Sequence, residues 1–330
     1  MISIRLSNKI KVVSFFSIIQ VVFLHANIIS YSTGHSKYVQ EVLTEEITRI
    51  AVPFFFLISG YLFFINADGS WAFFRNKMKR RVNSLVIPYI LFSILGGLFW
   101  AVFKGDDVVS TVLSSILIVP KVFYHLWFLH DLIIMVFLSP LLYFIIKKAP
   151  YIWVIICYVW ITGHYWNLFY ILNSVSLFFW GLGGIVALYY PRLAEYNFRD
   201  RSGFIFMLLT LWIFLSFIVT YTGRPYYTHG ILLVIGIFAV WGVYDSLFPL
   251  IENHPQILRV CEYSFCLYLF HEPILTGYKK LMFFFMEINQ YTSMAIYATS
   301  PVLTIVTILT IGKFTKRNIP SIYYFITGNR

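Results

Sequence analysis

The sequence is short of charged residues: Asp, Glu, Lys and Arg together make up 12% of its 330 positions. Soluble domains contain about a quarter charged residues, so this scarcity excludes an ordinary water-soluble fold. Hydrophobic residues account for 59% of the chain and aromatic residues for 20%. Together with apolar runs of about 20 residues, this composition predicts an all-α, polytopic membrane protein.

Cysteine is also scarce, and the motifs of several enzyme classes are missing. The three cysteines, Cys157, Cys261 and Cys266, fall in or at the edge of apolar runs and form no C-x-x-C pair, which argues against a disulfide framework. The chain has no G-x-S-x-G elbow and no P-loop, so we expect neither a covalent serine enzyme nor an ATPase. With no internal repeat, low-complexity tract or soluble segment, residues 1–330 are expected to form one integral-membrane domain.

Acidic residues are outnumbered, with 14 Asp and Glu against 25 Lys and Arg, and the formal net charge is +11. In a soluble protein this excess would suggest nucleic acid. Here the basic residues lie in short loops between apolar runs, where they set membrane topology. We therefore expect the lipid bilayer, and no nucleic acid, as a partner.

The apolar runs predict a bundle of about ten transmembrane helices. The basic residues are concentrated in the loops on the N-terminal side, so both termini should be cytoplasmic. The first run is too long for a signal peptide and lacks a small-residue cleavage site, so it is expected to remain as an uncleaved span. A shorter apolar segment, 108–119, is expected to form a surface or re-entrant helix. The candidate spans are 10–30, 47–66, 82–103, 126–146, 150–168, 171–190, 203–222, 229–249, 262–281 and 292–312.

One ionisable residue, His25, lies deep in the first span. At about 1.5 Å per helical residue, the steps from Lys11 carry His25 about 21 Å into a hydrocarbon layer of about 30 Å. An ionisable group at that depth costs several kcal/mol unless it faces a protein interior or a wet cavity, and it marks a functional site by default.

Arg49 enters the second span from the outer side, at a depth close to that of His25. Pro53 cannot donate to the carbonyl of Arg49, which leaves an acceptor beside the guanidinium. Two interpretations stay open: Arg49 belongs to a site with His25, or it snorkels to the membrane boundary.

A basic stretch, RNKMKRR, occupies residues 75–81 before the third span. Such a run is expected of any cytoplasmic loop that fixes topology. Clustered Lys and Arg at a helix entrance also suit the phosphates of a nucleotide-like molecule. The residues alone do not decide between these functions.

Two further spans carry polar groups. His125, Trp127 and His130 open the fourth span, with Asp131 next; the spacing of the histidines does not align two metal ligands on one helical face, so we expect a polar cavity lining and no metal site. In the ninth span, His271 and Glu272 precede a helix-kinking proline near mid-membrane. They are expected to face the bundle interior, either in a site or as interhelical hydrogen-bonding groups.

These stretches resemble, in order, those of the acyltransferase-3 family of bacterial inner-membrane proteins, which modify surface glycans. The resemblance rests on VVFLH, RIAVPFFFLISGYLFF, the basic stretch before VIPYI, HLWFLH and SFCLYLFHEPI, and it covers nearly the whole chain. It implies about ten core helices, an acyl-CoA donor reached from the cytoplasm as a substrate and not as a tightly bound cofactor, and O-acyl transfer, usually of acetyl, to a sugar hydroxyl outside.

The resemblance also assigns residues. The first-span histidine corresponds to His25 and the second-span arginine to Arg49, while the phosphate-binding stretch, the tryptophan motif and the late histidine correspond to Lys77, Arg80, Arg81, His125, Trp127 and His271. One departure concerns the arginine that many members carry eleven residues before the histidine, with an aspartate three residues earlier. Ser14 and Lys11 occupy those positions here, and we expect Lys11 to take over a donor contact.

The resulting hypothesis is general-base catalysis by His25, with Arg49 orienting the histidine or stabilising charge on the carbonyl oxygen. A proton-coupled transporter is the main alternative, because buried His and Glu, broken helices and basic loops also describe such carriers. An inactive structural partner of a polysaccharide assembly system is a third, supported by Ser14.

Overall fold

The computed structural model describes residues 2–118, 122–162, 167–168, 172–223, 226–252 and 254–328. Within these ranges the chain is almost entirely helical, which confirms the predicted all-α class. The exception is a pair of two-residue strands, β1 (Asn167–Leu168) and β2 (Leu172–Asn173), which pair antiparallel. The chain forms two compact units: unit one is Met1–Phe55 with Tyr190–Thr310, and unit two is Phe56–Tyr189 with Ile311–Arg330.

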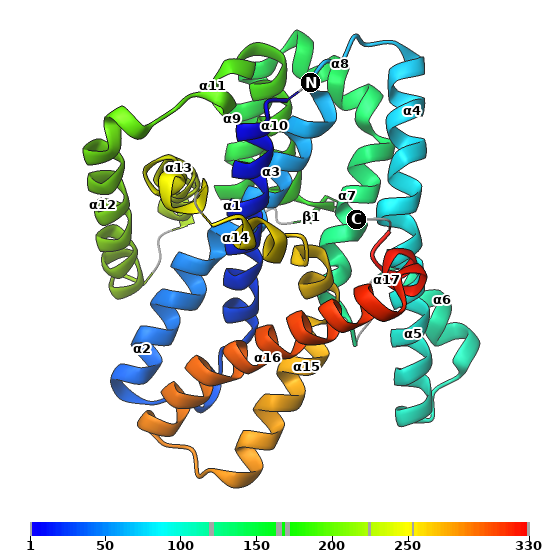
Figure 1. Cartoon of the computed structure of the whole chain (residues 1–330), viewed down its shortest axis with the longest axis vertical. Coiled ribbons are helices and arrows are strands. Elements are labelled where there is room, and N and C mark those ends of the chain that lie inside the picture. Colours follow the sequence, from blue (N-terminus) through cyan, green and yellow to red (C-terminus); the bar gives the residue numbers. More distant parts are fainter. Residues whose placement is uncertain are drawn as a thin grey trace. The chain divides into compact units, whose positions relative to one another are not determined.

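Unit one is organised around the first helix. The side chain of Ser3 accepts a hydrogen bond from the backbone N–H of Leu6 and starts α1, which ends at His25. Helices α13, α14 and α15 of the same unit pack against α1 (Figure 1). The helical elements that begin in this unit are α1 (Ile4–His25), η1 (Ile29–Tyr31), α2 (Gly34–Val42), the π-helix η2 (Leu43–Ile47), the 3₁₀ turn η3 (Thr48–Ile50), α3 (Ala51–Phe64), α11 (Pro191–Glu195), η6 (Arg199–Arg201), α12 (Ser202–Tyr221), α13 (Tyr226–Glu252), α14 (Pro255–Cys261), α15 (Ser264–Phe285) and α16 (Gln290–Asn318).

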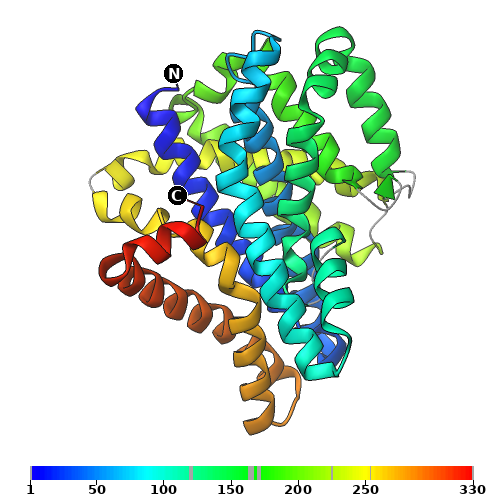
Figure 2. The same ribbon diagram turned by 90° about the vertical axis from the view of Figure 1, so that its right-hand side faces the viewer.

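Unit two contains one long interrupted helix. Ser70 caps the start of α4, which carries the basic stretch, and a π-helical turn joins it to the apolar α5 (Figure 2). Gly105 ends α5 in the left-handed conformation with φ +72°, where a glycine has no Cβ to clash. The helical elements that begin in this unit are α4 (Trp71–Arg81), η4 (Val82–Val86), α5 (Ile87–Lys104), α6 (Val108–Leu117), η5 (Tyr124–Leu126), α7 (Trp127–Phe137), α8 (Ser139–Lys148), α9 (Pro150–Thr162), α10 (Ser174–Tyr189) and α17 (Pro320–Ile326).

Two glycines bring α3 and α10 into backbone contact in unit two. A Cβ atom on Gly60 would lie 2.0 Å from the carbonyl oxygen of Trp180, and one on Gly183 would lie 1.9 Å from that of Leu57. Trp180 itself is fully buried against Phe63 and Phe64. The glycine-rich run WGLGG therefore serves close helix packing, as membrane helix interfaces commonly do.

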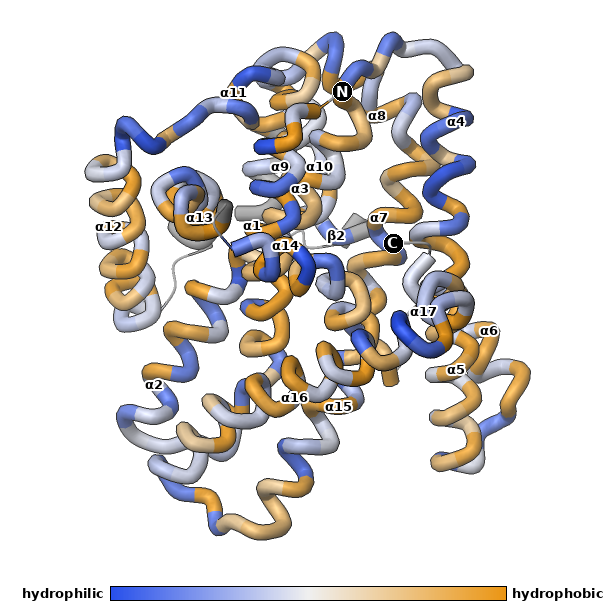
Figure 3. Tube along the Cα trace, viewed as in Figure 1, coloured by the Kyte–Doolittle hydropathy of each residue, from blue (hydrophilic) through white to orange (hydrophobic). Residues whose placement is uncertain are grey.

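Six helical segments among the described residues are long and apolar enough to cross a membrane, and the bent pair Tyr124–Phe137 and Ser139–Lys148 makes a seventh if it is one span. Figure 3 shows the contrast within unit two between the hydrophilic α4 and the apolar α5. The structure thus supports several of the predicted spans but does not confirm ten. The six segments are Ile4–Tyr31, Gly34–Phe64, Trp71–Lys104, Arg199–Tyr221, Gly230–Ile251 and Gln290–Asn318.

The remaining predicted spans are shorter or more polar as helices. The 171–190 span corresponds to the sixteen residues of α10, and the 262–281 span to α15, which carries Glu272, Lys279 and Lys280. Part of the 150–168 span lies outside the described residues, as do the basic residues Lys121, Arg224 and Arg330, and the side chain of Cys157 is likewise not described. The short segment predicted at 108–119 is a helix, α6, packed against α5.

Pro53 lies in the first turn of α3, where a missing N–H costs little. The helix is instead irregular at Arg49 itself, because the π-helical turn η2 ends at Ile47 and the 3₁₀ turn η3, Thr48–Ile50, contains Arg49. Wide turns of this kind are frequent at functional sites.

Candidate active site

His25 lies in unit one against two residues of α15. Its Nδ1 atom is 3.9 Å from Oε2 of Glu272, and its ring centroid is 5.3 Å from that of His271. The His25 side chain is 16% exposed and that of Glu272 is 9% exposed, while His271 is completely buried. His271 and Glu272 are almost 250 positions from His25 in the sequence, and the fold places them beside it.

The hydrogen bonds of this cluster define the donors and acceptors available. Nδ1 of His271 is 2.7 Å from the carbonyl oxygen of Tyr268, and because a carbonyl only accepts, Nδ1 carries the hydrogen. Nε2 is then the basic nitrogen of that ring. Oε1 of Glu272 accepts a hydrogen bond from Thr276 at 3.0 Å, which fixes the carboxylate with its other oxygen toward His25.

Arg49 belongs to the same unit. Its Nε donates to Oε2 of Glu45 at 3.1 Å, one helical turn earlier, and the arginine side chain is 45% exposed. Its charge acts electrostatically on the His25 ring, as does that of Lys279. The described hydrogen bonds of the guanidinium go to Glu45, and the proposed roles of Arg49 toward His25 or an oxyanion stay predictions.

The basic stretch belongs to unit two. The Lys77 ammonium donates to the carbonyl of Leu62 in the last turn of α3, at 2.9 Å, and lies over the rings of Phe63 and Phe73. Arg80 is exposed on α4, and Arg81 lines a shallow apolar crevice. Lys77 thus has a helix-capping contact and Arg80 is exposed, whereas Arg81 is half-buried beside apolar side chains.

The residues of the fourth predicted span also lie in unit two. His125 is buried beside Phe123, and Trp127 packs on Phe56. The His130 ring lies 5.9 Å from the Tyr89 ring, between centroids, in a tilted arrangement, and its Nδ1 atom is 3.5 Å from Oδ1 of Asp131. These side chains form an aromatic and polar cluster around the start of α7.

The hydrogen bonds of Asp131 run mainly to another helix. Its Oδ2 atom accepts from the hydroxyl of Ser176 at 2.6 Å and from the backbone N–H of Asn173 at 3.2 Å. A carboxylate at the start of α10 complements the positive end of the helix dipole. Asp131 therefore anchors α10 in addition to facing His130.

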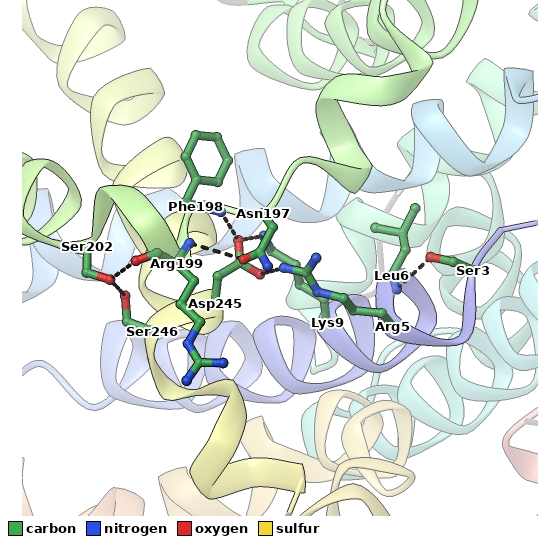
Figure 4. A network of polar contacts seen from close by, with 10 residues as sticks. All are labelled: Ser3, Arg5, Leu6, Lys9, Asn197, Phe198, Arg199, Ser202, Asp245 and Ser246. Atoms are coloured by element: carbon green, nitrogen blue, oxygen red, sulfur yellow. Dashed lines mark hydrogen bonds and ion pairs between the residues drawn. The ribbon is translucent and has the colours of Figure 1, made fainter.

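The first helix uses Lys9, not Lys11, for its buried ionic contact. Lys11 is exposed, whereas the Lys9 ammonium is 2.7 Å from Oδ2 of Asp245 and 4.4 Å from the Trp241 ring centroid. Asp245 also pairs with Arg5 and accepts the backbone N–H of Phe198 (Figure 4). The proposed donor contact of Lys11 stays a prediction.

Three residues of this arrangement had no place in the sequence-derived site. They are Lys9, Lys279 and Asp245. A carboxylate inside a predicted span, such as Asp245 near the end of 229–249, carries the signal of an intramembrane charge that needs a partner. The sequence gives no such signal for Lys279, because the adjacent residue is also a lysine. Only the structure distinguishes the two, since Lys280 is exposed.

The buried imidazole and carboxylate in unit one can accept and return a proton, which acyl transfer requires. No curated protein and no solved structure matches the chain. The acyltransferase domain of the acyltransferase-3 family matches residues 8–312, nearly the whole sequence, and includes every residue of the predicted site. The chain therefore belongs to the acyltransferase-3 family of membrane acyltransferases.

Proposed function

We propose that this protein moves an acetyl group from cytoplasmic acetyl-CoA to a sugar hydroxyl of a cell-surface glycan, such as an exopolysaccharide or O-antigen, or of its lipid-linked precursor. The observation that carries the proposal is the buried contact of His25 with Glu272 and His271 in a chain of an acyltransferase family. Among side chains, an imidazole is the usual choice for moving a proton near neutral pH.

In the proposed mechanism, Glu272 holds the His25 ring with Nδ1–H toward the carboxylate, so that Nε2 takes the proton of the acceptor hydroxyl. The hydroxyl oxygen forms the new ester bond at the thioester carbonyl, and the carbon–sulfur bond breaks. The imidazolium then returns its proton to the departing thiolate. Glu272 stabilises the imidazolium between these steps, as carboxylates do beside catalytic histidines.

Other residues receive supporting roles in the proposal. Arg49 stabilises charge on the carbonyl oxygen. Cations of the cytoplasmic side hold the phosphates of the donor, which is a substrate. Polar residues at the start of α7 in unit two, and others on α15 in unit one, are each assigned to the acceptor side. The residues assigned to the donor are Lys11 of unit one and Lys77, Arg80 and Arg81 of unit two, and those assigned to the acceptor are His271 and Glu272 of unit one and His125, Trp127 and His130 of unit two.

The proposal includes a topology of about ten spans with both termini cytoplasmic, in a bacterial inner membrane. The basic residues of the loops support this orientation. A reporter fused after Arg330 should therefore be active only if its enzyme works in the cytoplasm.

The function is tested with purified protein, radiolabelled acetyl-CoA and surface glycan from the source cells. The glycan is first treated with alkali to remove its esters. The native chain should transfer label, and His25→Ala should lower the rate by about 10²-fold or more, the usual contribution of a general base. His35→Ala is the control, because His35 is exposed on α2. Full transfer by folded His25→Ala protein would rule out the mechanism.

A transporter gives a different result in the same preparation. If the native chain neither releases CoA nor labels the glycan, but reconstituted vesicles take up solute in response to a proton gradient, the acyltransferase proposal is wrong. Loss of O-acetyl signals from the surface glycan of cells lacking the protein, measured by NMR, would support it independently.

A further inference from the structure

The last turn of α1 is held by three separate donors. The carbonyl oxygens at the end of a helix lack partners within it. Here the Phe23 carbonyl accepts from the backbone N–H of Ala26, and the Leu24 carbonyl accepts from the side-chain amide of Asn27. The carbonyl of His25 accepts from the Lys279 ammonium at 2.7 Å. The first two donors follow α1 directly in sequence, whereas the third comes from α15.

Lys279 contacts the backbone of the residue that carries the proposed base. A hydrogen bond with a charged donor is stronger than one between neutral groups, and a cation at the C-terminal end of a helix also complements its dipole. The contact is partly buried, which limits competition from water. It therefore restrains where the His25 Cα, and hence its ring, can lie.

The same helix supplies the partner of the His25 ring. Glu272 precedes Lys279 by seven residues, about two helical turns, so the same helix, α15, carries both the carboxylate and the ammonium. Glu272 lies beside the imidazole of His25, and Lys279 donates to the backbone carbonyl of His25. A movement of the α1 end away from α15 would therefore have to break the Lys279 hydrogen bond and would also separate His25 from Glu272.

We propose that Lys279 is a positioning residue for His25: its ammonium fixes the end of α1 on α15 so that the imidazole faces Glu272. This inference rests on the proposed function of His25. The neighbouring Lys280 provides the contrast, because it is exposed on the same helix. A lysine retained only for topology or for the membrane boundary would make these two positions equivalent.

The experiment compares Lys279→Met with Lys280→Met in the full chain, using acetyl-CoA and the de-esterified surface glycan. Rates are divided by the number of acetyl-CoA molecules bound per chain, so that misfolded protein does not count. Lys279→Met should lower kcat by about 10- to 100-fold, the range expected when a catalytic group is displaced, with KM for acetyl-CoA unchanged. Lys280→Met should stay within about twofold of the native rate, and Lys279→Arg should recover most of the loss, because a guanidinium can also donate to the carbonyl.

Equal kcat for the two methionine variants would overturn the inference, as would an arginine variant that binds acetyl-CoA normally but is as slow as Lys279→Met. If Lys279→Met does not fold, Lys279→Gln keeps a neutral donor and should fall between the native and fully impaired rates; a native rate would overturn the inference. A native chain that transfers no acetyl group contradicts the proposed function instead. The two failures are therefore distinct.

Discussion

Replacing Asp245 with asparagine should destabilise unit one strongly while keeping the size of the side chain. Asp245 is fully buried and is the ion-pair partner of both Arg5 and Lys9 (Figure 4). The Lys9 side chain is 3% exposed, enclosed by Asp245 and the Trp241 ring, so loss of the carboxylate leaves a buried ammonium uncompensated. Breaking a buried pair in this way costs about 3–5 kcal/mol.

Arg5 contributes much less to that cost. Its side chain is 32% exposed, so water can solvate the guanidinium after the substitution, and exposed pairs contribute about 1 kcal/mol or less. The predicted loss therefore comes chiefly from Lys9. It follows that Lys9→Met in the Asp245→Asn background should restore most of the stability, because methionine fills the space beside Trp241 without a charge.

The assay is denaturant unfolding in mixed micelles, followed by tryptophan fluorescence, for both single variants, the double variant and Asp200→Asn. The control makes the same chemical change at an exposed position in η6 of the same unit. A free energy of unfolding for Asp245→Asn that equals that of the control would refute the reasoning. So would a double variant as unstable as Asp245→Asn, because the buried Lys9 charge would then not be the cause.

Two further predictions concern local packing and capping. Gly183→Ala should destabilise the protein by about 1–3 kcal/mol, because the added methyl group would meet the backbone of Leu57. Gly277→Ala is the control and should not lower stability, because Gly277 in α15 has open space around it. Equal midpoints of thermal unfolding for the two variants would contradict this prediction. The second prediction concerns Asp107, the N-cap of α6, whose pKa is held below its usual value by hydrogen bonds from Ser110. The ionised cap therefore stabilises α6 above about pH 4, and this stabilisation is lost as the pH falls through the lowered pKa. Hydrogen exchange of α6, corrected for intrinsic rates, should show this loss in the native chain and, in Asp107→Ala, reduced protection already at neutral pH without the acid-dependent step; native-like protection in that variant would contradict the assignment.

Sequence reasoning located the elements of the fold better than the contacts between them. The helical class and the polar positions in the spans follow from composition and from the cost of burying His25, His271 and Glu272 in lipid. The contact between the first and the ninth predicted span does not, because no local pattern records which distant helices pack together. The local pair of Glu45 with Arg49 was readable from its spacing of four residues.

The number of spans illustrates the same limit. Hydropathy identifies apolar length, but α10 is short and α15 carries three charged residues, so both depart from a simple spanning helix. Asp245 shows the converse case, since a single acid in an apolar run has no local pattern that names its partners, yet its carboxylate joins two cations and a backbone N–H. Its partners come from segments more than 40 residues away.

The π-helical turn η4 has a consequence for comparing relatives. A π turn accommodates one extra residue, and one residue advances the face of an α-helix by about 100°. Residues 82–86 therefore set the direction in which the cationic side chains of α4 point relative to the packed face of α5. A one-residue deletion there would turn Arg80 and Arg81 about the helix axis by roughly a quarter of a circle relative to α5, although both arginines would still be present in the sequence. The number of residues between the basic run and VIPYI therefore determines the direction in which the cationic side chains point. A relative that aligns with a gap at this position should present its basic side chains on a different side of the helix.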